Sequence, residues 1–208
     1  MGARVIALAA AAVAYLLVSH WLMTAAPASP WNAVIVVGPM LGAASVMAWQ
    51  RRHRLLAAFA ALATAALLVQ AWRGHDLPAD SLYVCQHVAI HLLLALVFGL
   101  TLQAGRESLV TALARRVHGT LTPAMAAYSR KVTAAWTGYF LAMAALSLVL
   151  YGAAPFDVWA TFANLVTPFA ILVMFIGEYL LRYRLHPEFE RATLAQAVRA
   201  YADRGSHD

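Results

Sequence analysis

The 208-residue sequence is poor in cysteine and in charge. Its single cysteine, Cys85, excludes a disulfide within the chain, and the apolar residues around it favour a small buried hydrophobe over a reactive thiol. Only 12% of the residues are charged and 63% are hydrophobic, which leaves too little polar surface for a soluble domain of this size. The composition therefore predicts an integral membrane protein, with residues 1–208 forming a single polytopic domain in the phospholipid bilayer.

The sequence also lacks the short motifs of common enzymes. It has no phosphate-binding glycine loop, no Gly-x-Ser-x-Gly turn and no His-Glu-x-x-His zinc motif. These absences make a self-sufficient enzyme of a common type an unfavoured interpretation. They leave open an enzyme of another type, a transporter, and an accessory protein.

Six apolar stretches are long enough to cross about 30 Å of hydrocarbon at about 1.5 Å per helical residue. The first resembles a signal peptide, but its length predicts an uncleaved spanning helix. In the last, Pro168 removes one backbone donor, which predicts a bend or tilt. We therefore expect an all-α protein with six transmembrane helices. The stretches are residues 5–23, 31–49, 55–72, 82–102, 132–151 and 158–181.

Basic residues fall on one side of these predicted spans. If the helices alternate in direction, every one of the 15 Lys and Arg residues except Arg73 lies on the same side. Cytoplasmic connections carry such an excess, so both termini, a loop at residues 103–131 and a tail at residues 182–208 are predicted to be cytoplasmic. This bias also accounts for the net charge of +6, and nucleic-acid binding is not expected.

The loop at residues 103–131 has a periodicity of its own. Leu109, Leu113 and Val117 recur every four residues, which predicts a short amphipathic helix on the membrane surface. Gly119 is a typical residue for the end of such a helix.

Two further helix starts are marked by proline. Thr122 is a plausible N-cap with Pro123 at the first helical position, so the fifth spanning helix is predicted to begin in the cytoplasm. Pro187 similarly predicts the start of an amphipathic C-terminal helix. The apolar stripe of that helix consists of Leu194, Val198 and Tyr201.

Several runs in and after the loop resemble a family of bacterial inner-membrane proteins without an established activity. The runs are GRESL at 105–109, ARRVHG at 114–119, LTP at 121–123, YSRKVTAAW at 128–136, FAN at 162–164, TP at 167–168 and EY at 178–179.

The resemblance covers residues 85–190, and Ser108 stands where the family more often has proline. Members of the family often occur in gene clusters for aryl polyene pigments of the xanthomonadin type. The resemblance thus implies a multi-pass protein of the bacterial inner membrane. It also implies partners such as an acyl carrier protein and the proteins of polyene-lipid synthesis and export.

Histidines within the predicted spans are candidates for a cofactor site. His87 and His91 lie four residues apart and share one helix face, and His20 lies near the end of the first span. Neutral imidazole is a common metal ligand, so these residues could hold haem or a metal. A bis-histidine haem needs ligands on two helices, however, and the span has no carboxylate at metal-ligand spacing. Hydrogen-bonded packing or a polar cavity is therefore the favoured interpretation, and no cofactor is predicted.

Polar residues at the cytoplasmic side allow two interpretations. Glu178 lies one turn before Arg182, so the two residues could form a simple interfacial ion pair. Alternatively, they could belong to a pocket for an anionic headgroup or an acidic acyl carrier protein, because arginine suits phosphate and carboxylate. Asn164 is expected to bond the backbone freed by Pro168 or another helix. The remaining candidates for such binding are Arg106, Glu107, Arg116, His118, Tyr128, Arg130 and Lys131.

The leading functional hypothesis is an accessory inner-membrane protein that helps assemble or transfer an aryl-polyene-type lipid through a basic cytoplasmic face. The first alternative is a membrane enzyme acting on an acyl or isoprenoid lipid through Glu178 and His118. The second is a small-solute transporter or a haem or metal protein that uses His87 and His91.

Overall fold

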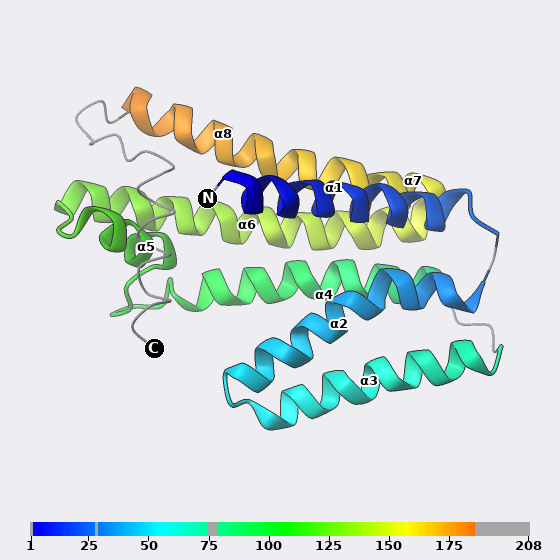
Figure 1. The fold of residues 1–208 in the computed structure, drawn as a ribbon. Coiled ribbons are helices and arrows are strands. Elements are labelled where there is room, and N and C mark those ends of the chain that lie inside the picture. The colour runs from blue at the N-terminus through cyan, green and yellow to red at the C-terminus, as the bar shows by residue number, and fades with distance from the viewer. Residues whose placement is uncertain (1, 28, 75–78, 186–208) are drawn as a thin grey trace. The chain divides into compact units, whose positions relative to one another are not determined.

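The chain folds as a set of helices (Figure 1). The computed structural model describes residues 2–27, 29–74 and 79–185, apart from the side chains of residues 2–5, 8 and 118. Within these residues the regular elements are helical throughout. They are α1 (Gly2–Thr24), α2 (Pro30–Gln50), α3 (Arg54–Trp72), α4 (Ala79–Leu100), α5 (Leu109–His118), α6 (Pro123–Ala153), α7 (Phe156–Thr161), a π-helical turn (Phe162–Val166) and α8 (Thr167–Leu185).

Five stretches of the described chain are long and apolar enough to cross a membrane. They match five of the six predicted spans closely and mark the chain as an all-helical membrane protein. The apolar helix α1 covers the remaining predicted span, but only its shorter part, Ala9–Thr24, enters this comparison. The five stretches are Pro30–Gln50, Arg54–Trp72, Ala79–Leu100, Pro123–Ala153 and Phe156–Leu185.

Local sequence signals place the ends of α5 and α6 correctly. Gly119 ends α5 with a φ of 74°, a value that favours glycine, and its N–H donates to the carbonyl of Arg115 at 2.9 Å. The Thr122 hydroxyl accepts a hydrogen bond from the N–H of Met125 at 3.2 Å, and α6 begins at Pro123. The amphipathic helix predicted from Pro187 onward lies outside the described residues.

The chain divides into two compact units, and α4, α6 and the last helical segment contribute residues to both. Unit 1 comprises Met1–Ala89 and Ala145–Pro168, and unit 2 comprises Ile90–Ala144 and Phe169–Asp208.

Unit 1 is built around small and aromatic residues. Its buried cluster brings Leu22 of α1 and Val36 of α2 together with Tyr83 of α4 and Trp159 of α7. Helix α3 pairs with α2, where the Ser45 hydroxyl donates to a backbone carbonyl at the start of α3 (Figure 1). The buried positions of α3 are alanines, which allow its backbone to approach α2 closely.

Unit 2 has an aromatic core. Trp136 and Phe140 of α6 are buried with Ala95 of α4, and the ring centroids of Trp136 and Phe175 of α8 lie 4.7 Å apart. Gly99 permits α4 and α6 to approach, because a Cβ at this position would lie only 3.3 Å from the methyl group of Thr137.

Cys85 is exposed on α4, so its predicted burial is wrong. Ala89, Leu92 and Leu96 are exposed at helical spacing along the same face. This is an outward-facing apolar face, and a run of hydrophobic residues in a membrane helix does not by itself distinguish lipid contact from core packing.

Candidate functional site

The first candidate region is α5, which is attached to the rest of unit 2 through hydroxyl groups. At its N-terminus, the N–H of Leu109 donates to the Thr101 hydroxyl at 3.0 Å, and the N–H of Val110 donates to the Thr133 hydroxyl at 3.2 Å. Ser108, the residue at the cap position, makes no side-chain cap bond. The free amides at the start of α5 are therefore satisfied by threonines that lie outside the helix.

A second pair of hydroxyls joins α5 to the start of α6. The Thr111 hydroxyl donates to the carbonyl of Ala126 at 3.4 Å, so Ser108 supplies the proton for its 2.6 Å contact with Thr111. Ser108 and Thr111 are both buried. These contacts hold α5 against α6 and fix which of its faces points outward.

The outward face of α5 combines an apolar residue, Leu113, with Arg116 three residues later. Thr111 is only 5% exposed, whereas Leu113, two residues later, is 39% exposed. Arg115 and Arg116 are exposed as well, and Arg115 forms a 2.8 Å ion pair with Glu107. A surface helix in water would show the opposite distribution of threonine and leucine.

Arg130 closes the connection between α4 and α5. Its guanidinium group donates to the carbonyl oxygens of Leu102 and Arg106. A planar guanidinium can reach two carbonyl groups at once, and its positive charge complements backbone carbonyls near the C-terminal end of a helix. Arg130 thus orders the loop, in addition to contributing to the basic surface.

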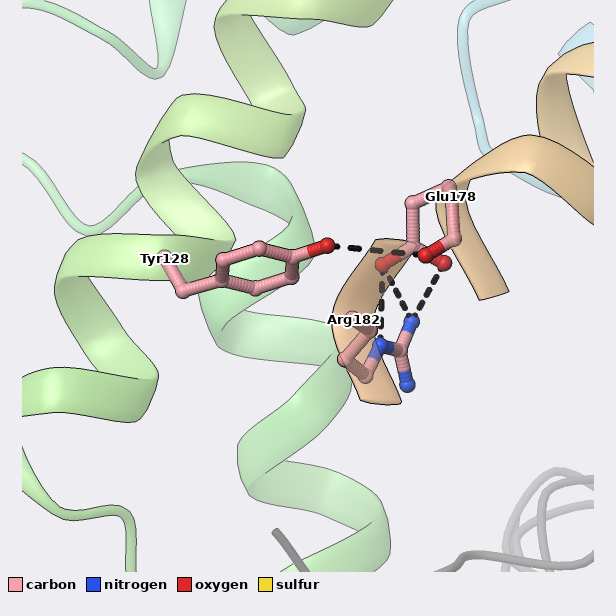
Figure 2. A network of polar contacts seen from close by, with 3 residues as sticks. All are labelled: Tyr128, Glu178 and Arg182. Carbon is pink, nitrogen blue, oxygen red and sulfur yellow. Dashed lines mark hydrogen bonds and ion pairs between the residues drawn. The ribbon is translucent and has the colours of Figure 1, made fainter. Parts of the chain in front are cut away.

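Glu178 and Arg182 form the ion pair that their spacing predicts (Figure 2). Nε of Arg182 lies 2.9 Å from Oε1 of Glu178, and Nη2 lies 2.6 Å from Oε2. The Tyr128 hydroxyl of α6 donates to the backbone carbonyl of Glu178 at 3.5 Å, as Figure 2 shows. Only 13% of the Glu178 side chain is exposed, so the pair is partly shielded from solvent.

The basic candidates thus take part in several separate sets of contacts. Glu107 pairs with Arg115, Arg130 bonds loop carbonyls, and Glu178 pairs with Arg182. Arg106, Arg116 and Lys131 are exposed, as are Glu107 and Arg130. The side chain of His118 lies outside the described part of the structure.

The second candidate region is the π-helical turn in unit 1, directly before Pro168. The N–H of Thr167 bonds to the carbonyl of Phe162, five residues back, and the Thr167 hydroxyl donates to the same carbonyl at 3.0 Å. A π turn, a feature that is frequent at functional sites, therefore lies directly before Pro168, where the sequence predicts a bend or tilt.

His87 of α4 contacts this turn. Its Nε2 lies 3.2 Å from the Thr167 hydroxyl oxygen. Because the proton of that hydroxyl goes to the carbonyl of Phe162, the hydroxyl oxygen can accept a hydrogen bond from Nε2 of His87 when that nitrogen carries a proton. The ring also lies edge-on to Trp159, with centroids 5.9 Å apart.

Asn164 lies within the π turn and is buried. Its amide nitrogen donates to the carbonyl of Ala160 at 3.0 Å and contacts the sulfur of Met23 on α1 at 3.2 Å. These contacts agree with a role in satisfying helix backbone and joining helices within unit 1.

The other two candidate histidines, His91 and His20, lie in different surroundings. His91 is buried, with its ring 6.2 Å from that of Phe140, and His20 is partly buried on α1. Among the described residues, no three His, Cys, Asp or Glu side chains gather as potential metal ligands.

Sequence reasoning missed the hydroxyl-bearing residues that organise both regions. Thr101 and Thr133 bind α5, Thr167 bonds the π turn, and buried Ser147 accepts a 2.9 Å hydrogen bond from the Trp159 indole. Serine and threonine in strongly apolar helices are a signal that could have identified them.

Comparisons with protein-family models, with curated proteins and with solved structures find no match to this chain.

Proposed function

We propose that this chain is an accessory protein of the bacterial inner membrane that helps assemble or transfer an aryl-polyene-type lipid. In this proposal it crosses the membrane six times, with both termini and residues 103–131 in the cytoplasm. The long apolar helices, the one-sided distribution of basic residues and the family resemblance of the loop support it.

The observation that carries the proposal is the outward face of α5. Exposed Leu113 beside exposed Arg116, three residues later on the same helix face, suits the boundary between acyl chains and headgroups, where leucine enters the apolar layer and arginine meets phosphate. Each arginine near an anionic leaflet contributes about 1 kcal/mol. When α5 lies on the membrane, it forms a rigid basic surface to which lipid or a synthase partner can bind.

Gene deletion with complementation tests the function. Loss of the gene should lower the amount of pigment lipid in the outer membrane, and the wild-type gene should restore it. The variant Arg116→Glu should restore less, because it reverses the charge on the outward face of α5. Arg73→Glu is the matched control, since Arg73 is predicted on the opposite side. Unchanged pigment lipid after deletion would overturn the proposal.

Reporter fusions test the topology separately. Alkaline phosphatase fused after Ala79 should be active, because this point is predicted to lie outside the cytoplasm. The same reporter fused after Thr120, in the predicted cytoplasmic loop, should be inactive. The reverse pattern would contradict the orientation.

A further inference from the structure

Two side-chain oxygen atoms of α4 are buried in unit 1 without a hydrogen-bond partner among the residues that the structure describes. They are the hydroxyl oxygen of Tyr83 and the side-chain carbonyl oxygen of Gln86. Tyr83 is only 3% exposed. Because buried polar groups in folded proteins are nearly always hydrogen-bonded to protein or to ordered water, both atoms need an explanation.

The two side chains pack near successive turns of α2. Residues 83 and 86 are three apart in one helix and are therefore neighbours on its surface. Tyr83 packs in one buried cluster with Val36 and Val37, and the amide nitrogen of Gln86 contacts the sulfur of Met40, one turn along α2. The orientation of the Gln86 amide follows from chemistry, because sulfur and the carbonyl oxygen are both acceptors.

Other polar groups lie near these two side chains, although the helices that pack here are largely apolar. The Tyr15 hydroxyl of α1 donates to the carbonyl of Val36 at 2.5 Å. Pro39 has no N–H, so it cannot supply the usual helical hydrogen bond to the carbonyl of Ile35.

We propose that a neutral hydroxyl group occupies this position between Tyr83 and Gln86. It accepts a hydrogen bond from the tyrosine O–H and donates its own proton to the amide oxygen of Gln86. A single hydroxyl satisfies both atoms, whereas a carbonyl or an ether could satisfy only the tyrosine. The hydroxyl belongs either to a water molecule or to the head of a lipid. This site lies in unit 1 and is independent of the proposed role of α5.

The sign of a stability change tests the proposal. Tyr83→Phe in the full-length purified protein should lower the thermal unfolding midpoint, because it removes a hydroxyl that has a partner. Tyr15→Phe is the matched control and should also lower the midpoint, since it deletes the bond to Val36. If the Tyr83 hydroxyl is instead unpaired, phenylalanine relieves a buried polar group, and the midpoint should stay the same or rise. That outcome would overturn the proposal.

A double variant and the removal of lipid identify the group. Tyr83→Phe should destabilise the protein less in the Gln86→Leu background than in the wild type, because both residues bind one hydroxyl. Its effects on the unfolding equilibrium constant in the two backgrounds should differ by about fivefold. Additive effects would contradict a shared group. If the Tyr83→Phe effect survives exhaustive delipidation, the hydroxyl belongs to water. If it disappears, and native mass spectrometry shows a lipid on the wild type that Tyr83→Phe lacks, the hydroxyl belongs to that lipid.

Discussion

The Thr133 hydroxyl accepts a hydrogen bond from the backbone N–H of Val110, 23 residues earlier in the chain, and donates its proton to the carbonyl of Ser129. Thr133 is fully buried. One side chain of α6 therefore satisfies an amide at the start of α5 that no residue of α5 itself can satisfy.

Replacing Thr133 by valine should detach the N-terminus of α5 while preserving the volume of the side chain. The variant leaves the Val110 amide without its partner, which should lower the free energy of unfolding by about 1–3 kcal/mol. Unfolding in mixed detergent micelles measures the change, and limited proteolysis of residues 103–120 reports α5 directly. Thr161→Val is the control, because exposed Thr161 bonds only a carbonyl of its own helix. Equal effects of the two variants would contradict the role of Thr133.

Arg130 and Arg116 should respond differently to lysine. Arg130→Lys keeps the charge but leaves one nitrogen to serve the carbonyl oxygens of Leu102 and Arg106, so stability should fall by about 1 kcal/mol. Arg116 is exposed, and Arg116→Lys should change stability by less than about 0.5 kcal/mol. Denaturation curves of both variants measure the difference. If lysine is tolerated at both positions, Arg130 contributes only its positive charge, and its bonds to the two carbonyl groups are not needed for stability.

The ion pair of Glu178 with Arg182 should contribute more than that of Glu107 with Arg115. The Glu178 side chain is 13% exposed and the Glu107 side chain 41%. Glu178→Gln should therefore cost about 1–2 kcal/mol, between the values typical of surface and buried pairs, and Glu107→Gln less than about 1 kcal/mol. Denaturation at low and high salt measures both, and only the Glu107 pair should weaken markedly with salt. A larger cost at Glu107 would contradict this order.

Ser147→Ala should leave the Trp159 indole N–H buried without an acceptor. Both residues are almost fully buried, and their hydrogen bond measures 2.9 Å. The expected loss of stability is about 1–3 kcal/mol. Thermal unfolding followed by tryptophan fluorescence measures it. Ser81→Ala removes a partner of Tyr151 at a more exposed contact and should cost less, so a larger loss at Ser81 would count against this interpretation.

Helix positions followed from short-range chemistry. Hydropathy located the long apolar helices, and Thr122, Pro123 and Gly119 marked helix ends within one residue. Each of these signals acts over a few residues, so the sequence pattern contains it. The missing amide proton of Pro168 likewise predicts a bend or tilt, whereas the π turn before it was not predicted.

The contacts of the candidate sites depend on packing between distant residues. His87 and Thr167 lie 80 positions apart, and no local pattern indicates that they meet. Charge likewise left two interpretations, an ion pair of Glu178 with Arg182 or one basic pocket, and it did not indicate that Arg130 bonds backbone carbonyls or that Arg115 takes Glu107 as its partner. Side-chain direction decided these pairings, and direction follows from how the helices pack.

The bond between Val110 and Thr133 also sets an order of events during synthesis. Helix α5 leaves the ribosome before the residue that caps it, and at about 5–20 residues per second the 23 residues after Val110 take roughly 1–5 s to be added. A ten-residue helix is marginal without tertiary support. We therefore expect the nascent loop to stay open until the start of α6 emerges, so that the insertion machinery meets an unfolded, arginine-rich segment.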